Sequence, residues 1–228
     1  YLSDEVVPSQ FDAFVQHLGE HGCADVVPTR VNTTAGGVAR ASVAGGPAGT
    51  ALVVFEQNGA IRGRTWSETD GLGDEVEIAA QGSRPRVAGS SIGWVVAYQG
   101  PTATDGDGIS ARTVSPGPTV GPAIAVNLQT QGLQDQPDVA MLSDGRFAVT
   151  WQNGGNIFAQ RYSAGGFGSQ GDQDEPVNTV TGAALQAPVI AGSGATGSFY
   201  VVAWSASQTG EIRARFLGDA TGYLYNSV

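Results

Sequence analysis

The chain contains the segment Pro137-Asp-Val-Ala-Met-Leu-Ser-Asp-Gly-Arg-Phe-Ala-Val-Thr-Trp151, and parts of this segment recur along the sequence. Its first four residues return as Pro85-Arg-Val-Ala88 and Pro188-Val-Ile-Ala191, with a less similar copy at Ala41-Ser-Val-Ala44. The alanines that end the copies, at positions 44, 88, 140 and 191, are 44, 52 and 51 positions apart. A period of this length indicates a protein built from one repeated supersecondary unit.

Each copy is followed by five mainly apolar residues that end in an aromatic side chain. Such runs between glycine- and serine-rich loops are typical of β-strands. They are Ala51-Leu-Val-Val-Phe55, Trp94-Val-Val-Ala-Tyr98, Phe147-Ala-Val-Thr-Trp151 and Tyr200-Val-Val-Ala-Trp204. In the last three the larger residues alternate, so we expect them to share one face of the strand. The residues between them are mostly apolar too, which predicts strands buried on both faces and core positions for Trp94, Trp151 and Trp204.

Two further strands complete each unit. The third begins at an isoleucine, at positions 61, 109, 157 and 212, and the fourth follows a glycine-containing turn, as in 75–78, 123–127 and 176–179. Four strands within 44 to 52 residues is the size of a β-propeller blade, which buries both faces only between neighbours. We therefore expect an all-β fold: a β-propeller of four-stranded repeats, with four to five blades, in a single domain spanning residues 1–228. Tandem small β-sandwich repeats are the alternative.

The predicted units cover approximately residues 38–83, 84–135, 136–186 and 187–228, preceded by a partial unit at 1–37. Residues 9–18 of the partial unit have apolar side chains at helix spacing. However, Ala13-Phe-Val-Gln-His17 also lines up with Ile157-Phe-Ala-Gln-Arg161. We give the repeat precedence and expect strands here. The ring then closes either by sharing strands between the termini or with residues outside the chain, and five blades, or part of a larger ring, are favoured over four.

The amino-acid composition and net charge indicate a folded protein with many turns and exclude several kinds of binding partner. The chain has 228 residues, of which 41% are hydrophobic, and its 34 Gly and 11 Pro are spread as many turns would require. A formal net charge of −10 repels phosphate backbones and anionic membrane surfaces, so we expect neither nucleic-acid binding nor membrane insertion. The single cysteine, Cys23, excludes an internal disulfide framework. The chain starts at Tyr1 without Met, so we expect a processed product or a piece of a longer polypeptide.

The repeat resembles a known kind of sequence. The pattern of residues 137–151, followed by Ile157-Phe-Ala-Gln-Arg-Tyr162 and Val177-Asn-Thr179, is similar to propeller-like repeats of large secreted and cell-surface proteins of bacteria, of the adhesin or calcium-binding-repeat type. The similarity is sharp over residues 136–190 and looser elsewhere. The unit at 38–83 lacks the Pro-x-Val-Ala start and the Asp-Gly turn. The resemblance implies an extracellular binding or scaffold role and implies no catalytic residue.

Two groups of residues could bind a metal ion. Asp105 and Asp107 flank Gly106 before a predicted strand, and closely spaced carboxylates suit calcium, which takes about six to eight oxygen ligands. This loop offers only two carboxylates, so a solvated turn is favoured, and no cofactor is firmly predicted. His17, His21 and Cys23 could ligate zinc or copper, but they match no metal motif and a structural role is favoured.

Five side chains are candidates for ligand binding. Four arginines recur at one place in the repeat, and a guanidinium there could bind an acidic sugar, although a structural contact with an aromatic ring or a loop carbonyl is favoured. They are Arg64, Arg112, Arg161 and Arg215. Trp66 has no aromatic counterpart in the next unit. Near a strand end it could be exposed and form a platform for a sugar ring, so it is the best single binding candidate.

The sequence contains no recognisable catalytic constellation. The only histidines lie in the partial unit, no Gly-x-Ser-x-Gly elbow occurs, and no phosphate-binding loop is present. We therefore expect a non-catalytic secreted or cell-surface propeller that recognises carbohydrate or an extracellular protein, in adhesion or assembly. The alternative is an enzyme, either a glycosidase or a metal-dependent enzyme, that uses carboxylates at the propeller tunnel. Carboxylates gathered at one mouth of the tunnel would favour the enzyme.

Overall fold

A computed structural model gives the fold of residues 2–7, 10–18, 27–166, 174–179, 184–193, 199–218 and 224–225. The elements within them are almost entirely strands, because short β-favouring runs alternate with glycine-rich turns. They are β1 (Leu2–Val7), β2 (Gln10–Val15), β3 (Thr29–Arg30), β4 (Val38–Gly45), β5 (Ala51–Gln57), β6 (Ala60–Ser67), β7 (Gly71–Leu72), β8 (Val76–Ala79), β9 (Ser83–Ser90), β10 (Gly93–Gly100), β11 (Gly108–Val114), β12 (Ile124–Ala125), β13 (Gln134–Met141), β14 (Phe147–Asn153), β15 (Asn156–Tyr162), β16 (Glu175–Pro176), β17 (Leu185–Gly192), β18 (Phe199–Ala206), β19 (Glu211–Gly218) and β20 (Leu224–Tyr225), with single 3₁₀ turns at Pro47–Gly49 and Ala164–Gly166.

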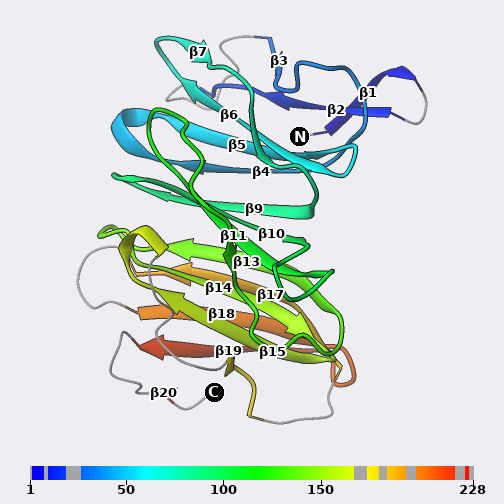
Figure 1. Cartoon of the computed structure of the whole chain (residues 1–228), viewed down its shortest axis with the longest axis vertical. Coiled ribbons are helices and arrows are strands. Elements are labelled where there is room, and N and C mark those ends of the chain that lie inside the picture. The colour runs from blue at the N-terminus through cyan, green and yellow to red at the C-terminus, as the bar shows by residue number, and fades with distance from the viewer. Residues whose placement is uncertain are drawn as a thin grey trace.

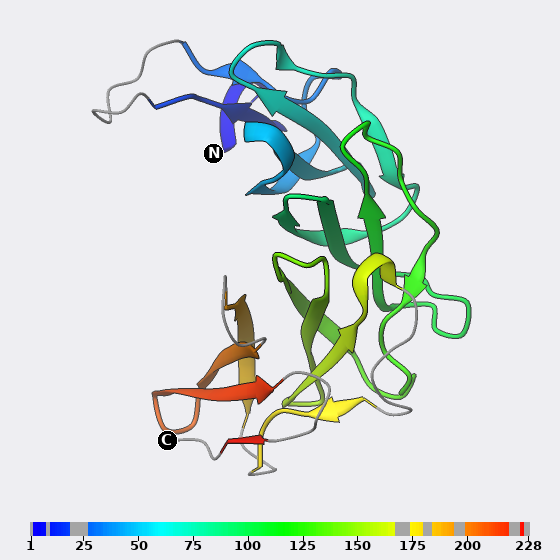
Figure 2. The same cartoon turned by 90° about the vertical axis from the view of Figure 1, so that its left-hand side faces the viewer.

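These strands form five antiparallel sheets that follow one another along the chain. The sheets are β1–β3, β4–β8, β9–β12, β13–β16 and β17–β20, and within each the strands pair in sequence order, except that β8 pairs with β6. The sheets stack along the longest axis of the molecule (Figure 1) and, in the perpendicular view, fan out as an arc with the first and last sheets at its two ends (Figure 2). The first strands β4, β9, β13 and β17 contact one another and form the concave side of the arc. The predicted all-β propeller fold is confirmed.

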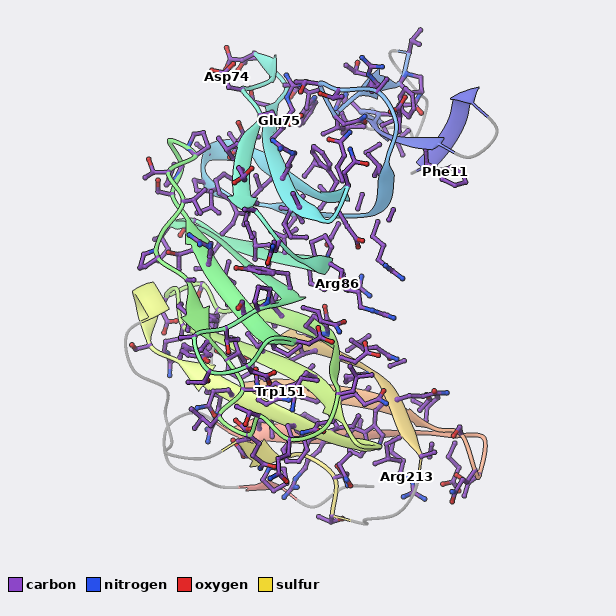
Figure 3. All side chains as sticks on the ribbon, turned by 45° about the vertical axis from the view of Figure 1, so that its right-hand side comes forward. Phe11, Asp74, Glu75, Arg86, Trp151 and Arg213 are labelled. Carbon is purple, nitrogen blue, oxygen red and sulfur yellow. The ribbon has the colours of Figure 1, made fainter. Side chains whose placement is uncertain are left out.

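The core lies between successive sheets. Between the second and third sheets, Leu52 and Val54 of β5 pack against Trp94 of β10. At each later boundary, smaller aliphatic side chains of one sheet likewise pack against aromatic side chains of the next sheet. The predicted core positions of Trp94, Trp151 and Trp204 are confirmed, because all three are at most 4% exposed. Figure 3 shows Trp151 within this stack of sheets. The strands β10 and β14 are buried on both faces, as expected for blades enclosed by neighbours.

A repeated asparagine holds the third strand of a blade to its fourth. The Oδ1 of Asn127 accepts a hydrogen bond from the backbone N–H of Ile109 at 2.7 Å, and the Oδ1 of Asn178 accepts one from Ile157 at 2.7 Å. In the first sheet, Asn32 accepts the same bond from Ala13 at 2.9 Å. All three asparagines are buried, so the bonds satisfy strand amides that would otherwise lack a partner. The expectation of a strand rather than a helix at residues 10–15 is therefore confirmed, and it is explained by this contact.

The last sheet differs from the expectation of strands buried on both faces. In β18, buried residues alternate with exposed or half-exposed ones, because no sheet in the described part of the chain covers its outer face. The sheets begin at Val38, Ser83, Gln134 and Leu185, close to the repeat boundaries predicted at 38, 84, 136 and 187. The division into units, and their grouping into one domain, stay predictions.

Candidate functional site

The first strand of each complete sheet carries a bulge on the concave side of the arc. The pairing register shifts between Val38 and Arg40 in β4, and the other three first strands shift at the equivalent place. In those three strands the bulged residue precedes a proline and has a left-handed backbone, with φ near 53°: Arg84, Gln136 and Ala187. Non-glycine residues in this conformation carry strain that persists only where surrounding contacts hold it, and such strain gathers at functional sites.

Contacts between neighbouring sheets hold the bulges. The backbone N–H of Arg84 donates to the Oε2 of Glu56 in the preceding sheet at 3.0 Å. The backbone N–H of Ala187 donates to the Oε1 of Gln136 in its preceding sheet at 2.7 Å. The bulge amides of Arg84 and Ala187 are therefore each satisfied by a side chain from the neighbouring blade, which helps to fix the relative position of the two blades.

The bulges line a cavity of about 420 Å³ on the concave side. Its walls come from all four first strands, and its charged lining residues are Arg40, Arg84 and Arg86. Figure 3 shows Arg86 projecting from the concave side. A cavity of this size is within the range that binds small ligands or a few sugar rings, and it lies where the axis of a propeller runs.

Three carboxylates stand next to this cavity, each beside one of the arginines. Arg40 lies 3.3 Å from Glu56 (Nη1 to Oε2), and Arg84 lies 3.4 Å from Asp135 (Nε to Oδ1). Asp138, directly after the cavity-lining Pro137, lies 3.8 Å from Arg86 (Oδ1 to Nε). Asp135 and Asp138 flank the bulge of β13, whose residues Gln136 and Pro137 line the cavity.

Asp138 has the most unusual environment of the three. Its Oδ2 accepts a hydrogen bond from the backbone N–H of Ile190 in the next sheet at 2.9 Å, and its side chain is 18% exposed. Burial raises the pKa of this carboxyl above its ordinary value, although the hydrogen bond from Ile190 and the charge of Arg86 act in the opposite direction. A carboxyl whose pKa is raised by burial is a candidate for a general acid.

The four recurrent arginines lie away from this cavity, and each donates to backbone carbonyls. Arg64 donates to Gly73 at 2.7 Å and to Val31 of the first sheet at 3.0 Å. Arg112 donates to Gly121 at 2.9 Å, and Arg161 donates to Gly218 at 2.6 Å and pairs with Glu175 at 3.1 Å. Arg215, which is buried, donates to Val177 at 2.6 Å and to Pro176 at 3.3 Å. These contacts join strands and blades, and a ligand-binding role for the arginines stays a prediction.

Trp66 is the second-last residue of β6 and is half-buried rather than fully exposed. Its ring stacks on the imidazole of His17, with ring centroids 5.5 Å apart and an angle of 24° between the planes. The two residues belong to neighbouring sheets, so the stack ties the first sheet to the second. One side of the indole is therefore already engaged, and its use as a sugar platform stays a prediction.

The loop with Asp105 and Asp107 uses its carboxylates internally. Asp105 accepts hydrogen bonds from the backbone N–H of Asp107 and from the Nδ2 of Asn127, both at 3.1 Å, and Asp107 accepts one from Gln99 at 3.1 Å. Within the described residues, no three His, Cys, Asp or Glu side chains are grouped to hold a metal ion. Calcium binding here stays a prediction. His21 and Cys23, from the other suggested metal group, lie outside the described residues.

The residues around the cavity are ones that the sequence does not single out. Arg86 and Asp138 each follow the proline of the Pro-x-Val-Ala repeat, and Val189 holds the same place in the last unit. The position after the repeated proline could have indicated the site. The residues around it are apolar in every copy and mark a strand, whereas this position is Arg86, Asp138 or Val189 and so changes in charge from copy to copy. The bulge next to these positions could not be predicted from the sequence.

Comparisons with known proteins identify the fold. No model of a protein family matches the sequence, and no curated protein matches it. An α-L-arabinanase from Penicillium chrysogenum, solved with arabinobiose, matches with a TM-score of 0.59 and 13% identity over 94% of this chain and 69% of that chain. A subtype N10 neuraminidase-like protein, from an isolate of the little yellow-shouldered bat, matches with a TM-score of 0.53 and 13% identity, over 84% of this chain and 58% of that chain. An endo-arabinase from Bacteroides thetaiotaomicron matches with a TM-score of 0.47 and 15% identity, over 79% and 76%.

The comparisons correct one expectation from the sequence. The sequence analysis expects a non-catalytic binding or scaffold propeller, and this expectation is contradicted, because a solved structure that matches 94% of the chain is an arabinanase, which is an enzyme. At 13% identity the likeness shows the fold alone, so the alternative interpretation, an enzyme of the glycosidase type, stays a prediction. The sequence predicts this possibility only as the alternative, because its repeated positions mark structure and no repeated position carries a carboxylate that would single out a site.

No helix among the described residues is long and apolar enough to span a membrane.

Proposed function

We propose that this chain is a carbohydrate-cleaving propeller of the glycoside-hydrolase type, with its active site in the cavity on the concave side of the arc. The observation that carries the proposal is Asp138, a largely buried carboxyl with a raised pKa at the edge of a cavity between four blades. Fold likeness to an arabinanase supports it. Propeller folds host many functions, so the proposal rests on the site and uses the fold as an analogy.

Asp138 is the proposed general acid. Hydrolysis of a glycosidic bond needs a proton on the departing oxygen, and a carboxyl whose pKa is raised by burial is suited to supply it. The hydrogen bond from Ile190 fixes one carboxyl oxygen at 2.9 Å. The other oxygen, Oδ1, lies 3.8 Å from the Nε of Arg86, which lines the cavity.

The second carboxylate required by this chemistry is Asp135 in our proposal. It lies across the bulge from Asp138 on the same strand, and its partner is the guanidinium of Arg84 at 3.4 Å. Glycoside hydrolysis uses two carboxyl groups with different roles, one as acid and the other as base or nucleophile, and we propose the second role for Asp135. Glu56, which accepts the backbone N–H of Arg84, braces the same arginine from the preceding sheet.

The substrate class that we propose is a polysaccharide, and arabinose-containing chains are the first to test because the matching structure was solved with arabinobiose. The cavity of about 420 Å³ accommodates a few sugar units, and its guanidinium groups can donate to sugar hydroxyls. We also propose an extracellular location, which the resemblance of the repeat to those of secreted and surface bacterial proteins supports.

The experiment that tests the proposal is an assay of reducing-end release from a panel of polysaccharides that includes arabinan. The wild-type chain should cleave at least one member of the panel. The substitution Asp138→Asn keeps the shape of the side chain and removes the acid, so it should lower kcat/KM by at least about 100-fold. Asp135→Asn should cause a comparable loss.

The matched control is Asp74→Asn, a carboxyl-to-amide change at an exposed position far from Arg86 (Figure 3). This variant should retain the wild-type rate. A wild-type chain that cleaves nothing in the panel, or an Asp138→Asn variant with an unchanged rate on a cleaved substrate, would refute the proposed active site.

A further inference from the structure

The cavity on the concave side differs in charge from the chain as a whole. Its charged lining residues are Arg40, Arg84 and Arg86, and none of the other described residues that line it is acidic. The chain has 11 basic residues against 21 acidic ones and a net charge of −10. A hollow lined by one sign of charge attracts ligands of the opposite sign. The lining therefore indicates an anionic ligand.

The carboxylates that pair with these arginines are less accessible than the arginines themselves. Each arginine lies beside one of three carboxylates, Glu56, Asp135 or Asp138. The arginine side chains are 37–52% exposed, whereas the carboxylate side chains are 14–18% exposed. The cation of each pair is thus the member that meets the cavity, and the carboxylate holds it in place. A guanidinium held in this way loses less conformational entropy when a ligand binds.

Two of the arginines keep unused donors. The contacts of Arg84 and Arg86 with their carboxylates run through Nε, at 3.4 Å and 3.8 Å. In the part of the chain that the structure describes, the Nη atoms of these two side chains donate no hydrogen bond, although a guanidinium has five N–H groups in a fixed fork. A carboxylate has two oxygens in one plane and can accept two parallel N–H bonds from such an edge. Both arginines are therefore available to a planar anion.

The positive charge lies on one side of the cavity. Arg40 and Arg84 hold the same place in neighbouring units, four residues before the repeated alanines at positions 44 and 88. Gln136 and Ala187 hold this place in the next two units, where the lining also includes two prolines and Val189. The second and third sheets thus form a cationic wall, and the fourth and fifth form an uncharged one. A sugar acid has matching parts, an anionic group and a ring with apolar C–H faces.

The proposed reaction leaves one of these cations without its counter-charge. Asp138 must carry its proton to act as the general acid. Its partner Arg86 then has no ionised carboxylate beside it among the described residues, whereas the other two arginines keep theirs. One positive charge at the cavity is uncompensated in the reactive state. A ligand with a carboxylate at this place supplies the missing negative charge.

We infer that the cavity binds a sugar unit that carries a carboxylate, held by Arg84 and Arg86, and that the polysaccharide cleaved there is an acidic one with uronic-acid units. The inference rests on the proposed function and names the substrate class of that same site. The net charge of −10 does not oppose the contact, because charges more than about 8 Å away are largely screened at physiological ionic strength.

Calorimetric titration of the Asp138→Asn chain tests the inference, because this variant imitates the protonated acid and does not consume the ligand. The ligands are trimers of galacturonate, glucuronate and mannuronate, each with its methyl ester, which keeps the shape and removes the charge. A trimer with sulfate esters in place of carboxylates is titrated alongside. At least one acid trimer should bind with a Kd below about 5 mM. Its methyl ester should bind at least about tenfold more weakly.

Two substitutions in the same background assign the contact to the arginines. Arg84→Gln introduces the residue that the chain itself has at position 136 with the same left-handed backbone, and Arg86→Gln removes the second guanidinium. Each should weaken binding of the acid trimer by at least about tenfold. The control is Arg213→Gln, an arginine that also pairs with a carboxylate but lies far from Arg86 (Figure 3). It should leave the affinity within about twofold.

The outcomes separate this inference from the proposed function. The inference is overturned if no acid trimer binds, if the esters or the sulfated trimer bind as tightly as the acids, or if both arginine variants keep the affinity. Cleavage of a neutral polysaccharide by the wild type, with no binding of an acid trimer, overturns the inference and leaves the proposed function intact. Arginine-dependent binding of an acid trimer, with no cleavage of any acidic or neutral polysaccharide, supports the assigned ligand and refutes the hydrolysis.

Discussion

The indole N–H of Trp94 donates to the backbone carbonyl of Ala44, at 3.2 Å, across the boundary between the second and third sheets. Trp151 is equally buried at the next boundary, but its Nε1 has no hydrogen-bond partner among the described residues. Two tryptophans in neighbouring blades thus have similar burial and different polar environments. The difference arises because the two rings occupy different ends of their strands and meet different parts of the preceding blade.

Replacing each tryptophan by phenylalanine separates these two environments. Trp94→Phe leaves the carbonyl of Ala44 without its donor, whereas Trp151→Phe removes an indole N–H that has no partner. We expect Trp94→Phe to lower the free energy of unfolding by about 1 kcal/mol more than Trp151→Phe. Urea denaturation of both variants measures the difference, and a larger loss for Trp151→Phe would contradict the assignment. Trp151→Ala should cost about 3–5 kcal/mol, because it empties a buried site between blades.

The repeated asparagine predicts a second stability effect. Asn178→Ala leaves the backbone N–H of Ile157 buried without an acceptor. We expect a loss of about 1–3 kcal/mol in the free energy of unfolding. Gln208→Ala, at an exposed turn residue, is the control and should change stability by less than about 0.5 kcal/mol. Equal losses in both variants would show that the asparagine is not holding the strand.

A variant of Arg215 tests whether the recurrent arginines stabilise the fold or bind a ligand. Its Nη1 donates to the carbonyls of Val177 and Pro176 in the preceding sheet, and the residue is 9% exposed. Arg215→Met keeps much of the length and removes the donors, so we expect a loss of about 1–3 kcal/mol in unfolding free energy. Calorimetric titration of the variant with a ligand of the wild type should give an unchanged affinity. Lower affinity with unchanged stability would restore the binding role.

Much of the fold could be predicted from the sequence, and little of the site. The Pro-x-Val-Ala starts and the runs ending in Tyr98, Trp151 and Trp204 determine strand identity, because packing between blades needs the same apolar residues at the same places. The role of Asp138 depends on a bulge at Gln136 and on Arg86 and Ile190 from two other blades. No pattern within one repeat contains that information. The stacking of Trp66 on His17 could not be predicted for the same reason, since it depends on how two units meet.

The raised pKa of Asp138 makes the stability of the chain depend on pH in a definite direction. Burial raises the pKa of this carboxyl from its ordinary value of 3.8. Between that value and the folded-state value, the folded chain binds more protons at this residue than the unfolded chain does. Stability from this group is therefore complete below about pH 3.8 and is lost as the pH rises through the folded-state pKa.

The substitution Asp138→Asn removes this pH dependence and keeps an oxygen that can accept the hydrogen bond from Ile190. We expect the variant to gain stability relative to the wild type as the pH rises, and to be the more stable of the two at pH 7, because the wild-type chain must then bury an ionised group whose partner Arg86 is half-exposed. Urea denaturation of both chains between about pH 4 and pH 8 measures the difference. In the same interval the wild-type kcat/KM should fall as Asp138 loses its proton, because a general acid must be protonated to act. A stability difference that shrinks with rising pH would mean that Asp138 is held ionised in the folded chain, and the role of proton donor would then have to pass to another carboxyl of the cavity.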